Sequence, residues 1–371
     1  MTENNTSTAS SSTGTDRAVL QEIVDGLVEG GITGVRLRFR DAHGEWTGAA
    51  GTGELDGTEA PPADGHYRIG SNTKTFTAVV VLRLVAEGRI DLDTAVAEYL
   101  PEIGIDPRIT VRMLLQHTTG VFNHTGEVYE DGTVVTGIPF QGREWVEGRF
   151  KSYRPGELVA FSLARPSRFE PGTDWSYANT NYVLARLVVE KVTGRGLAEE
   201  LDRLIVGPLG LTGTSLPDGT TELPTPHAHA YYRYDHDGEE RIADVTAQDP
   251  SWVSTGGDMV STPRDLQVFI TALVGGRLLP ASLLAEMFTV HEKVPYGLGV
   301  FVHEVPGGGT VITHNGGIAG HAALMYASAD GSRVLTAGLN YVDDKDLSMS
   351  GPFQAVNQRI VQEVFGVGPA E

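Results

Sequence analysis

The segment that follows Gly70-Ser71 constrains the fold of this chain more than any other. It runs to Glu87, and its apolar side chains recur at the spacing expected of a buried helix. These side chains are Phe76, Val79, Val80, Leu82, Val85 and Ala86. We therefore expect a helix around which the rest of the chain packs. The small residues Gly70 and Ser71 predict a turn at its start, where a serine is favoured as a cap.

Ser71 and Lys74 are one helical turn apart and share a face of this helix. A serine hydroxyl is a poor nucleophile until a base removes its proton, and a lysine whose pKa is lowered by burial can be that base. The N–H of Ser71, near a helix N-terminus, could also help to bind an oxyanion. The alternative is a capping serine and a solvated lysine, and the S-x-x-K spacing alone does not separate the two.

Composition limits the classes of function. The chain has 371 residues, which is enough for two lobes, and its 40% hydrophobic and 20% charged residues are typical of a globular protein. A net charge of −20 argues against binding to nucleic acid or to an anionic membrane surface. Because the chain has no cysteine, disulfides and thiol chemistry are excluded. We expect no cofactor and no metal, and the oligomeric state stays open.

The N-terminal segment has none of the features of a signal peptide. Residues 1–15 are rich in Thr, Ser and Asn, which predicts a disordered tail. Met1–Asp16 lacks the basic start and the apolar run of a signal peptide. From the sequence as written we expect a cytoplasmic protein.

The hydrophobic periodicity along the remaining chain is strand-like in some segments and helical in others. Alternation with period two predicts strands at 35–40, 45–51, 297–305, 310–314, 322–327 and 333–340. Helices are predicted at 16–29, 109–117, 179–193, 202–209, 262–274 and 352–365. The middle of the chain, from about residue 91 to 250, is interpreted as helices and loops only.

This pattern predicts an α/β (α+β) fold with two lobes. Residues 16–70 and 290–371 would form an antiparallel sheet flanked by the N- and C-terminal helices. Residues 71–289 would form a mainly helical lobe. We expect the active site in the cleft between the lobes, since a cleft is a usual place for a ligand.

Tyr177-Ala178-Asn179 precedes the apolar helix predicted at 179–193. A phenol held near an ammonium is pushed toward its anion and can relay protons. An asparagine side chain offers both a donor and an acceptor, which suits a substrate amide. The alternative is a tyrosine that packs its ring and an asparagine that caps the following helix.

His314-Asn315-Gly316-Gly317 ends a predicted strand. Glycines at this point would let a substrate backbone approach closely and could leave an N–H free for an oxyanion. His314 could polarise a substrate group or transfer a proton. The alternative is an ordinary exit from a strand into a turn.

In this order, S-x-x-K, then Y-A-N about a hundred residues later, then H-x-G on a late strand, the motifs resemble the serine β-lactamase and penicillin-binding protein superfamily. The most similar branches are the class C β-lactamases and the soluble D-alanyl-D-alanine carboxypeptidases. The resemblance covers roughly residues 16 to 366 and implies a β-lactamase-like fold. It extends to the stretches Gly88–Asp93, Ile109–Gly120, Ser251–Gly257 and Tyr296–Gly299.

The resemblance implies a role for each matching residue. Ser71 is the expected nucleophile that forms an acyl-enzyme. Lys74 and Tyr177 are expected to share the proton transfers, and the sequence does not decide which of them is the base. The N–H groups of Ser71 and Gly317 would form the oxyanion hole. The expected substrate-binding residues are Asn179 on the acyl side, His314 where many relatives carry Lys, Asn315, Gly317, and the cleft-lining Trp252 and Phe122.

Two departures from the carboxypeptidases bear on the substrate. In those relatives an Arg soon after the Tyr-Gly-Leu-Gly stretch helps to hold a terminal carboxylate, but here Val300–His303 follows. Hydroxyl residues in and after the third motif are replaced by Asn315 and Gly317. A fork of donors suited to a carboxylate is therefore missing. An ester, a primary amide or a carrier-linked acyl group is easier to accommodate than a free-carboxylate D-alanyl-D-alanine peptide.

We therefore expect a serine hydrolase or acyltransferase, of amidase, esterase or peptidase type. It would take a small-molecule or peptide-like, D-amino-acid-like amide or ester, with water or an amine as acceptor. An intracellular transacylase of natural-product biosynthesis is the second hypothesis. Further alternatives are a D-alanyl-D-alanine carboxypeptidase, a β-lactamase, and a penicillin-binding sensor that is acylated once without turnover.

Overall fold

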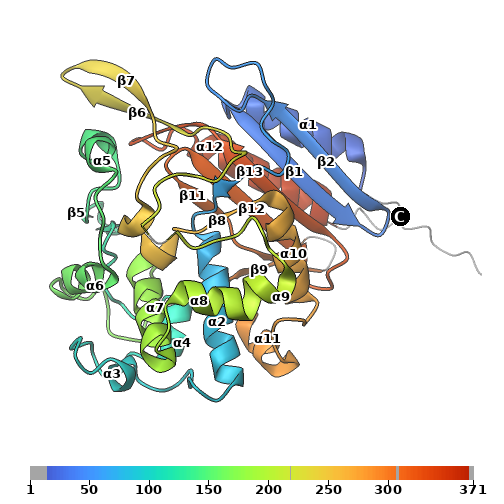
Figure 1. Ribbon diagram of the computed structural model, residues 1–371. Helices are drawn as coiled ribbons and strands as arrows, with labels where there is room; N and C mark the ends of the chain where they lie inside the picture. The colour runs from blue at the N-terminus through green and yellow to red at the C-terminus, as the bar shows by residue number, and fades with distance from the viewer. Residues whose placement is uncertain (1–14, 218, 306–308, 367–371) are drawn as a thin grey trace, which may run out of the picture.

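Helix α2 (Asn72–Ala86) stands in the middle of the molecule (Figure 1). The computed structural model describes residues 15–217, 219–305 and 309–366. All α2 side chains from Asn72 to Leu82 are buried. A helix that is covered on every side needs apolar residues around its whole circumference, as this sequence has. The expected buried helix is confirmed.

A seven-stranded antiparallel sheet joins the two ends of the chain, because β1 pairs with β13. The strand order is β2-β1-β13-β12-β10-β9, and β11 pairs with β12. The strands are β1 (Gly34–Asp41), β2 (Gly44–Gly51), β9 (Phe301–Glu304), β10 (Thr310–Thr313), β11 (Gly316–Ile318), β12 (His321–Ser328) and β13 (Val334–Asn340).

Helices cover both faces of this sheet (Figure 1). Helix α1 (Arg17–Glu29), which Asp16 caps, and the C-terminal α12 (Ser350–Arg359) with η4 (Ile360–Phe365) form one core with the sheet. Helix α10 (Pro263–Val274) lies against β12 and β13 on the other face. Side chains of β12 alternate between the two cores, so its residues from Ala322 to Ala327 are all hydrophobic. The β-lactamase-like fold expected from the sequence, with an antiparallel sheet and flanking terminal helices, is confirmed.

Most of the other helices lie around α2 on the side away from the sheet, whereas the helix at residues 142–148 packs against the strand at residues 231–236 (Figure 1). These helices are α3 (Val96–Tyr99), α4 (Val111–Gln116), α5 (Gly142–Gly148), α6 (Pro155–Leu163), α7 (Asn179–Thr193), α8 (Leu197–Leu201), η1 (Asp202–Val206), α9 (Gly207–Leu209) and α11 (Ala281–Met287). Two short 3₁₀ segments, η2 (Pro250–Trp252) and η3 (Ser254–Gly256), lead back toward the start of α2.

The middle of the chain also contains strands, so its interpretation as helices and loops alone was wrong. One turn in this region shows why strands form there. Asp237 and Gly238 both have positive φ, at 59° and 83°, and Asp-Gly is a strong signal for a two-residue hairpin. The short strands are β3 (Tyr67–Arg68), β4 (Gly126–Val128), β5 (Val134–Thr136), β6 (Tyr231–His236), β7 (Glu239–Asp244), β8 (Val260–Ser261) and β14 (Val342–Asp344).

The tail predicted at residues 1–15 lies outside the described residues, except for Thr15. Within the described ranges, no helix combines the length and the apolar character that a membrane span requires.

Phe76 of α2 and Phe269 of α10 stack at 3.6 Å between ring centroids, and both are fully buried. Because α10 also packs on the sheet, this contact links the central helix to the sheet. We expect Phe269→Ala to lower the free energy of unfolding by about 3–5 kcal/mol, measured by urea denaturation. Phe150→Ala is the control, since Phe150 is 49% exposed. A similar loss of unfolding free energy in both variants would show that the Phe76–Phe269 stack contributes no more to stability than an exposed phenylalanine.

Candidate active site

Ser71 occupies the N-cap position of α2, but its side chain does not cap the helix. The turn is set by Gly70, whose φ is +50°. Strand β11 packs directly on this turn: a Cβ on Gly316 would lie 2.0 Å from the Ile69 carbonyl oxygen. Glycine is therefore required at 316 for the strand to come this close. Because the hydroxyl of Ser71 is not used as a cap, it is available to the side chains beside it.

Lys74 reaches this hydroxyl from one turn further along α2. Its Nζ lies 3.1 Å from Ser71 Oγ and 2.8 Å from Asn179 Oδ1, and it also contacts the Gly256 carbonyl oxygen. The side chain is fully buried, and burial lowers the pKa of Lys74 well below its ordinary value, with a smaller opposing effect from the Asp258 carboxylate. The alternative of a solvated lysine is therefore excluded.

Tyr177 approaches Ser71 from the other side. Its hydroxyl donates a hydrogen bond of 2.8 Å to Ser71 Oγ. Burial raises the pKa of Tyr177, and the hydrogen bond to Ser71 offsets only part of this effect. The expectation that a nearby ammonium would push this phenol toward its anion is wrong, because the lysine beside it is itself driven toward the neutral amine.

These two pKa shifts give the hydrogen bonds a direction. A neutral amine has two N–H donors and one lone pair. As an ammonium, Lys74 donates to Ser71 Oγ and to the oxygens of Asn179 and Gly256. In the neutral form its two donors match the oxygens of Asn179 and Gly256, which leaves its lone pair for the Ser71 hydroxyl. The neutral Tyr177 phenol donates to the same Oγ. The arrangement therefore points the proton of Ser71 at Lys74.

Asn179 is the first residue of α7, yet its side chain makes no cap. Its Oδ1 accepts from Lys74, and its Nδ2 donates to Thr125 Oγ1 at 3.2 Å. The loop before it is held by His117, whose Nδ1 accepts from the Ala178 N–H at 3.2 Å. The Y-A-N motif thus enters the site as side chains, not as a helix cap.

The backbone beside Ser71 offers two N–H groups. In the part of the chain that the structure describes, the Ser71 N–H has no intramolecular acceptor. Gly317 follows closely, because a Cβ on Gly70 would lie 2.5 Å from the Gly317 nitrogen. Two backbone N–H groups at the start of a helix and on a neighbouring strand are a common form of oxyanion hole.

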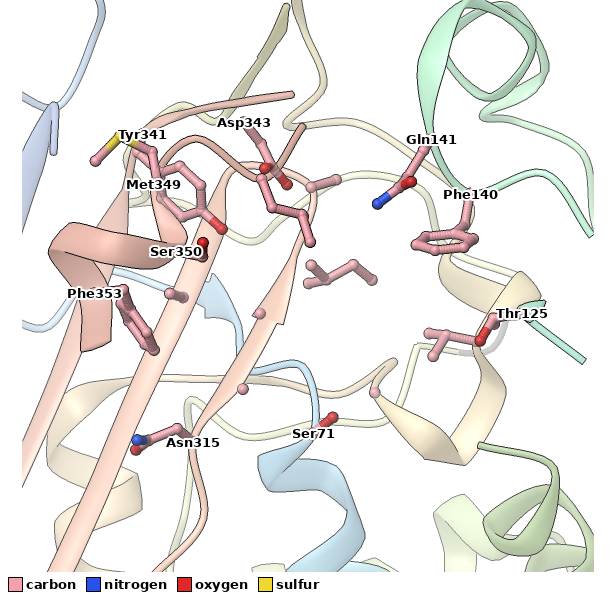
Figure 2. A pocket seen from close by; sticks show the side chains of 18 of the residues that line it. Ser71, Thr125, Phe140, Gln141, Asn315, Tyr341, Asp343, Met349, Ser350 and Phe353 are labelled. Carbon is pink, nitrogen blue, oxygen red and sulfur yellow. The ribbon is translucent and has the colours of Figure 1, made fainter. Parts of the chain in front are cut away.

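A cavity of about 410 Å³ opens at Ser71 (Figure 2). Its walls bring together several residues that the motifs singled out: Ser71, Tyr177, Asn179, Trp252, Asn315 and Gly317. The Trp252 ring stacks on Phe140 at 5.7 Å between centroids, which makes one wall apolar and aromatic. The side chains that meet here come from segments far apart in the sequence.

Two of the expected substrate-binding residues do not line this cavity. Phe122 is buried, its carbonyl oxygen accepts from the hydroxyls of Ser162 and Thr180, and its ring packs under Arg165. His314 is also buried, with Nδ1 2.9 Å from the Asn315 carbonyl oxygen. Burial lowers the pKa of His314 to about 3, so it is neutral at physiological pH and does not supply the positive charge of a lysine.

Sequence reasoning missed the contribution of the C-terminal segment. Tyr341 and Asp343 line the cavity, although the motifs do not include either of them. Asp343 lies on β14, which pairs with β6, and this pairing places it at the cavity. An acidic pair in a loop gives no local signal for this. Gly256, whose carbonyl oxygen contacts Lys74, was found only as part of the Ser251–Gly257 resemblance.

Comparison with known proteins places these features in context. A model of the Beta-lactamase family matches residues 20–347. Esterase EstB of Burkholderia gladioli is 32% identical over 181 residues, which are 46% of this chain and 43% of EstB. The chain thus matches less than half of the length of that relative.

Solved structures align over nearly the whole chain. A D-stereospecific amidohydrolase from Streptomyces sp. is 38% identical with a TM-score of 0.78, covering 92% of this chain and 99% of that one. D-amino acid amidase from Ochrobactrum anthropi SV3, complexed with D-phenylalanine, is 26% identical with a TM-score of 0.79, covering 95% of this chain and 99% of that one.

The lowered pKa of Lys74 predicts the pH dependence of acylation. If its neutral amine removes the proton of Ser71, the acylation rate rises with pH as Lys74 deprotonates and levels off well below the ordinary lysine pKa. We expect Lys74→Met to lower the rate by about 10²-fold or more and to remove this rise, measured by stopped-flow with a chromogenic ester. The exposed Lys191→Met is the control. A retained pH profile in Lys74→Met would assign the rise to another group.

The close packing of β11 on the Ser71 turn predicts a specific effect of Gly316→Ala. The added methyl group would meet the Ile69 carbonyl oxygen and displace the strand. We expect a loss of about 1–3 kcal/mol in the free energy of unfolding and slower acylation of Ser71. Gly148→Ala, where a Cβ meets nothing within 4 Å, should change neither. Normal acylation in Gly316→Ala would contradict the importance of this contact.

Proposed function

Because the chain belongs to the beta-lactamase family of serine hydrolases, we propose that it hydrolyses amides of small D-amino acids, and related esters, through an acyl-Ser71 intermediate. The observation that carries this proposal is the charge of the cavity. Among the described residues that line it, Asp343 is the only charged one. A pocket with a carboxylate and no cation disfavours substrates that carry a free carboxylate.

The first half of the proposed reaction uses the groups around Ser71. Lys74 Nζ takes the proton of Ser71 as Oγ bonds to the carbonyl carbon of the substrate. The N–H groups of Ser71 and Gly317 hold the oxygen that becomes negative. The bond from carbon to the leaving nitrogen then breaks. The proton held by Lys74 is then transferred to the leaving nitrogen. The Tyr177 hydroxyl, which donates a hydrogen bond to Oγ, is placed to relay this proton.

In the second half, an acceptor attacks the acyl-Ser71 ester. The acceptor gives its proton to the same pair of groups, the bond from carbon to Oγ breaks, and Ser71 regains its proton. Water gives hydrolysis, and an amine gives the transacylation that is our alternative proposal. Asn179 Nδ2 has a second hydrogen beyond its bond to Thr125, and it supports the proposal as a donor to the acyl side of the substrate.

Two further observations favour amides of apolar D-amino acids. The named relatives with similar structures are a D-stereospecific amidohydrolase and a D-amino acid amidase complexed with D-phenylalanine. The cavity also has an aromatic wall at Phe140 and Trp252, which suits an apolar side chain. A carboxypeptidase role receives no such support, since no described residue that lines the pocket offers a positive charge to a terminal carboxylate.

We expect the protein to hydrolyse D-phenylalaninamide at least about tenfold faster than L-phenylalaninamide, measured by ammonia release. Intact-mass spectrometry with an ester of D-phenylalanine should detect an adduct on Ser71. Ser71→Ala should lose the adduct and lower turnover by about a thousandfold or more, whereas the exposed Ser332→Ala should behave as wild type. Equal rates for the two enantiomers would contradict the D-selectivity, and turnover by Ser71→Ala would contradict the nucleophile. An amide product on adding amines would favour the transacylase.

A further inference from the structure

Asp343 enters the cavity from the side opposite Ser71 (Figure 2). It lies on β14, which pairs with β6, and its Oδ1 accepts from the Asp344 N–H at 2.9 Å. This backbone donor helps to hold the carboxylate in place. Within the described residues Asp343 forms no ion pair, so none of them supplies a counterion.

Among the described residues, the charged group that acts on the Asp343 carboxylate is Asp344, which is also acidic. The Asp344 carboxylate accepts from Ser348, and the positive charge of Arg233 acts on Asp344. Two tyrosines, Tyr341 and Tyr232, also face this region of the cavity. Burial and the charge of Asp344 raise the pKa of Asp343 to about 6, so the carboxylate is largely ionised at neutral pH yet lacks a partner.

A partly buried carboxylate without a counterion is a favourable acceptor for a cation in a ligand. The C-terminal segment adds the apolar side chains of Leu347, Met349 and Phe353 to the cavity, together with the hydroxyl of Ser350. An ammonium bound here would therefore be held by one charge-assisted hydrogen bond in a place partly shielded from water, where such a bond is stronger than at a surface.

The position of Asp343 sets how far this ammonium must be from the reacting carbonyl. Ser71 and Asp343 lie on opposite sides of the cavity (Figure 2), so an ammonium at Asp343 is separated from a carbonyl carbon at Ser71 by the width of the cavity. The α-ammonium of a single amino acid amide is one bond away from the carbon next to its carbonyl and stays near the Ser71 side. The N-terminal ammonium of a two-residue acyl group extends about 3.3 Å further toward Asp343.

One edge of β11 pairs with β12, and residues 316–318 line the cavity. An extended acyl group can lie along this strand, as peptides do when they add to a sheet edge. We propose that Asp343 is a specificity-determining residue that binds the N-terminal ammonium of a dipeptidyl acyl donor, so that the site favours dipeptide amides with a free amino terminus over neutral analogues. This inference rests on the proposed function.

The test compares two ligands that differ in one group. Glycyl-D-phenylalaninamide carries the ammonium, and propionyl-D-phenylalaninamide has a methyl group in its place. We expect the Ser71→Ala protein, which cannot be acylated, to bind the glycyl compound about tenfold or more tighter, as measured by calorimetry at pH 7.5. Adding Asp343→Asn should abolish this preference. Adding Asp346→Asn, which changes an exposed carboxylate of the same segment, should leave it intact.

The asparagine at 343 keeps an oxygen for the Asp344 N–H, and thermal unfolding checks that the fold is retained. Equal affinity for the two compounds in the Ser71→Ala protein, or a preference that survives Asp343→Asn, would overturn the inference. Hydrolysis of both compounds by the wild type is measured separately. If both compounds are hydrolysed but bind equally well, the ammonium site is refuted and the proposed function stands. If the glycyl compound binds more tightly but neither compound is hydrolysed, the proposed function is refuted and the ammonium site stands.

Discussion

The desolvation of Lys74 is the constraint on which the site depends. An ammonium at this position would be buried without a carboxylate against it, which is costly, so burial drives the side chain toward the neutral amine. The three oxygen atoms around Nζ belong to α2, α7 and η3. A displacement of any of these elements would leave a buried polar group unpaired, so the same contacts that prepare the base also hold the three elements together.

The same arrangement explains why Tyr177 and Lys74 can act together without competing. Burial favours the neutral form of both groups, which means a proton on the phenol and none on the amine. Both groups lie within hydrogen-bond distance of Ser71 Oγ, Lys74 Nζ at 3.1 Å and the Tyr177 hydroxyl at 2.8 Å. A neutral amine can accept the proton of Ser71 while the neutral phenol donates to the same oxygen.

The cavity is built by parts of the chain that have little in common in sequence. The catalytic groups come from the starts of α2 and α7, whereas the far wall comes from the C-terminal segment that packs on the sheet beside α1. Asp343 places a carboxylate in this cavity, and the neutral His314, which is buried outside its lining, adds no positive charge. The electrostatic character is therefore opposite to that of a carboxylate-binding site. Substrate selection would thus depend on the cavity wall formed by the C-terminal segment, whereas the acylation chemistry depends on the residues around Ser71.

The sequence by itself determined the elements with strong local signals. The helix after Ser71, the apolar α7, the terminal helices and the alternating strands follow from periodicity, and the ordered motifs identified the family. Tertiary structure alone decided three other matters. It made Ser71 and Asn179 partners of Lys74 instead of helix caps, it neutralised His314 by burial, and it turned Asp343 into the cavity by pairing β14 with β6. The physical reason is that a pKa and the direction of a side chain depend on neighbours brought in from distant parts of the chain, whereas a helical or strand period depends on residues a few positions apart.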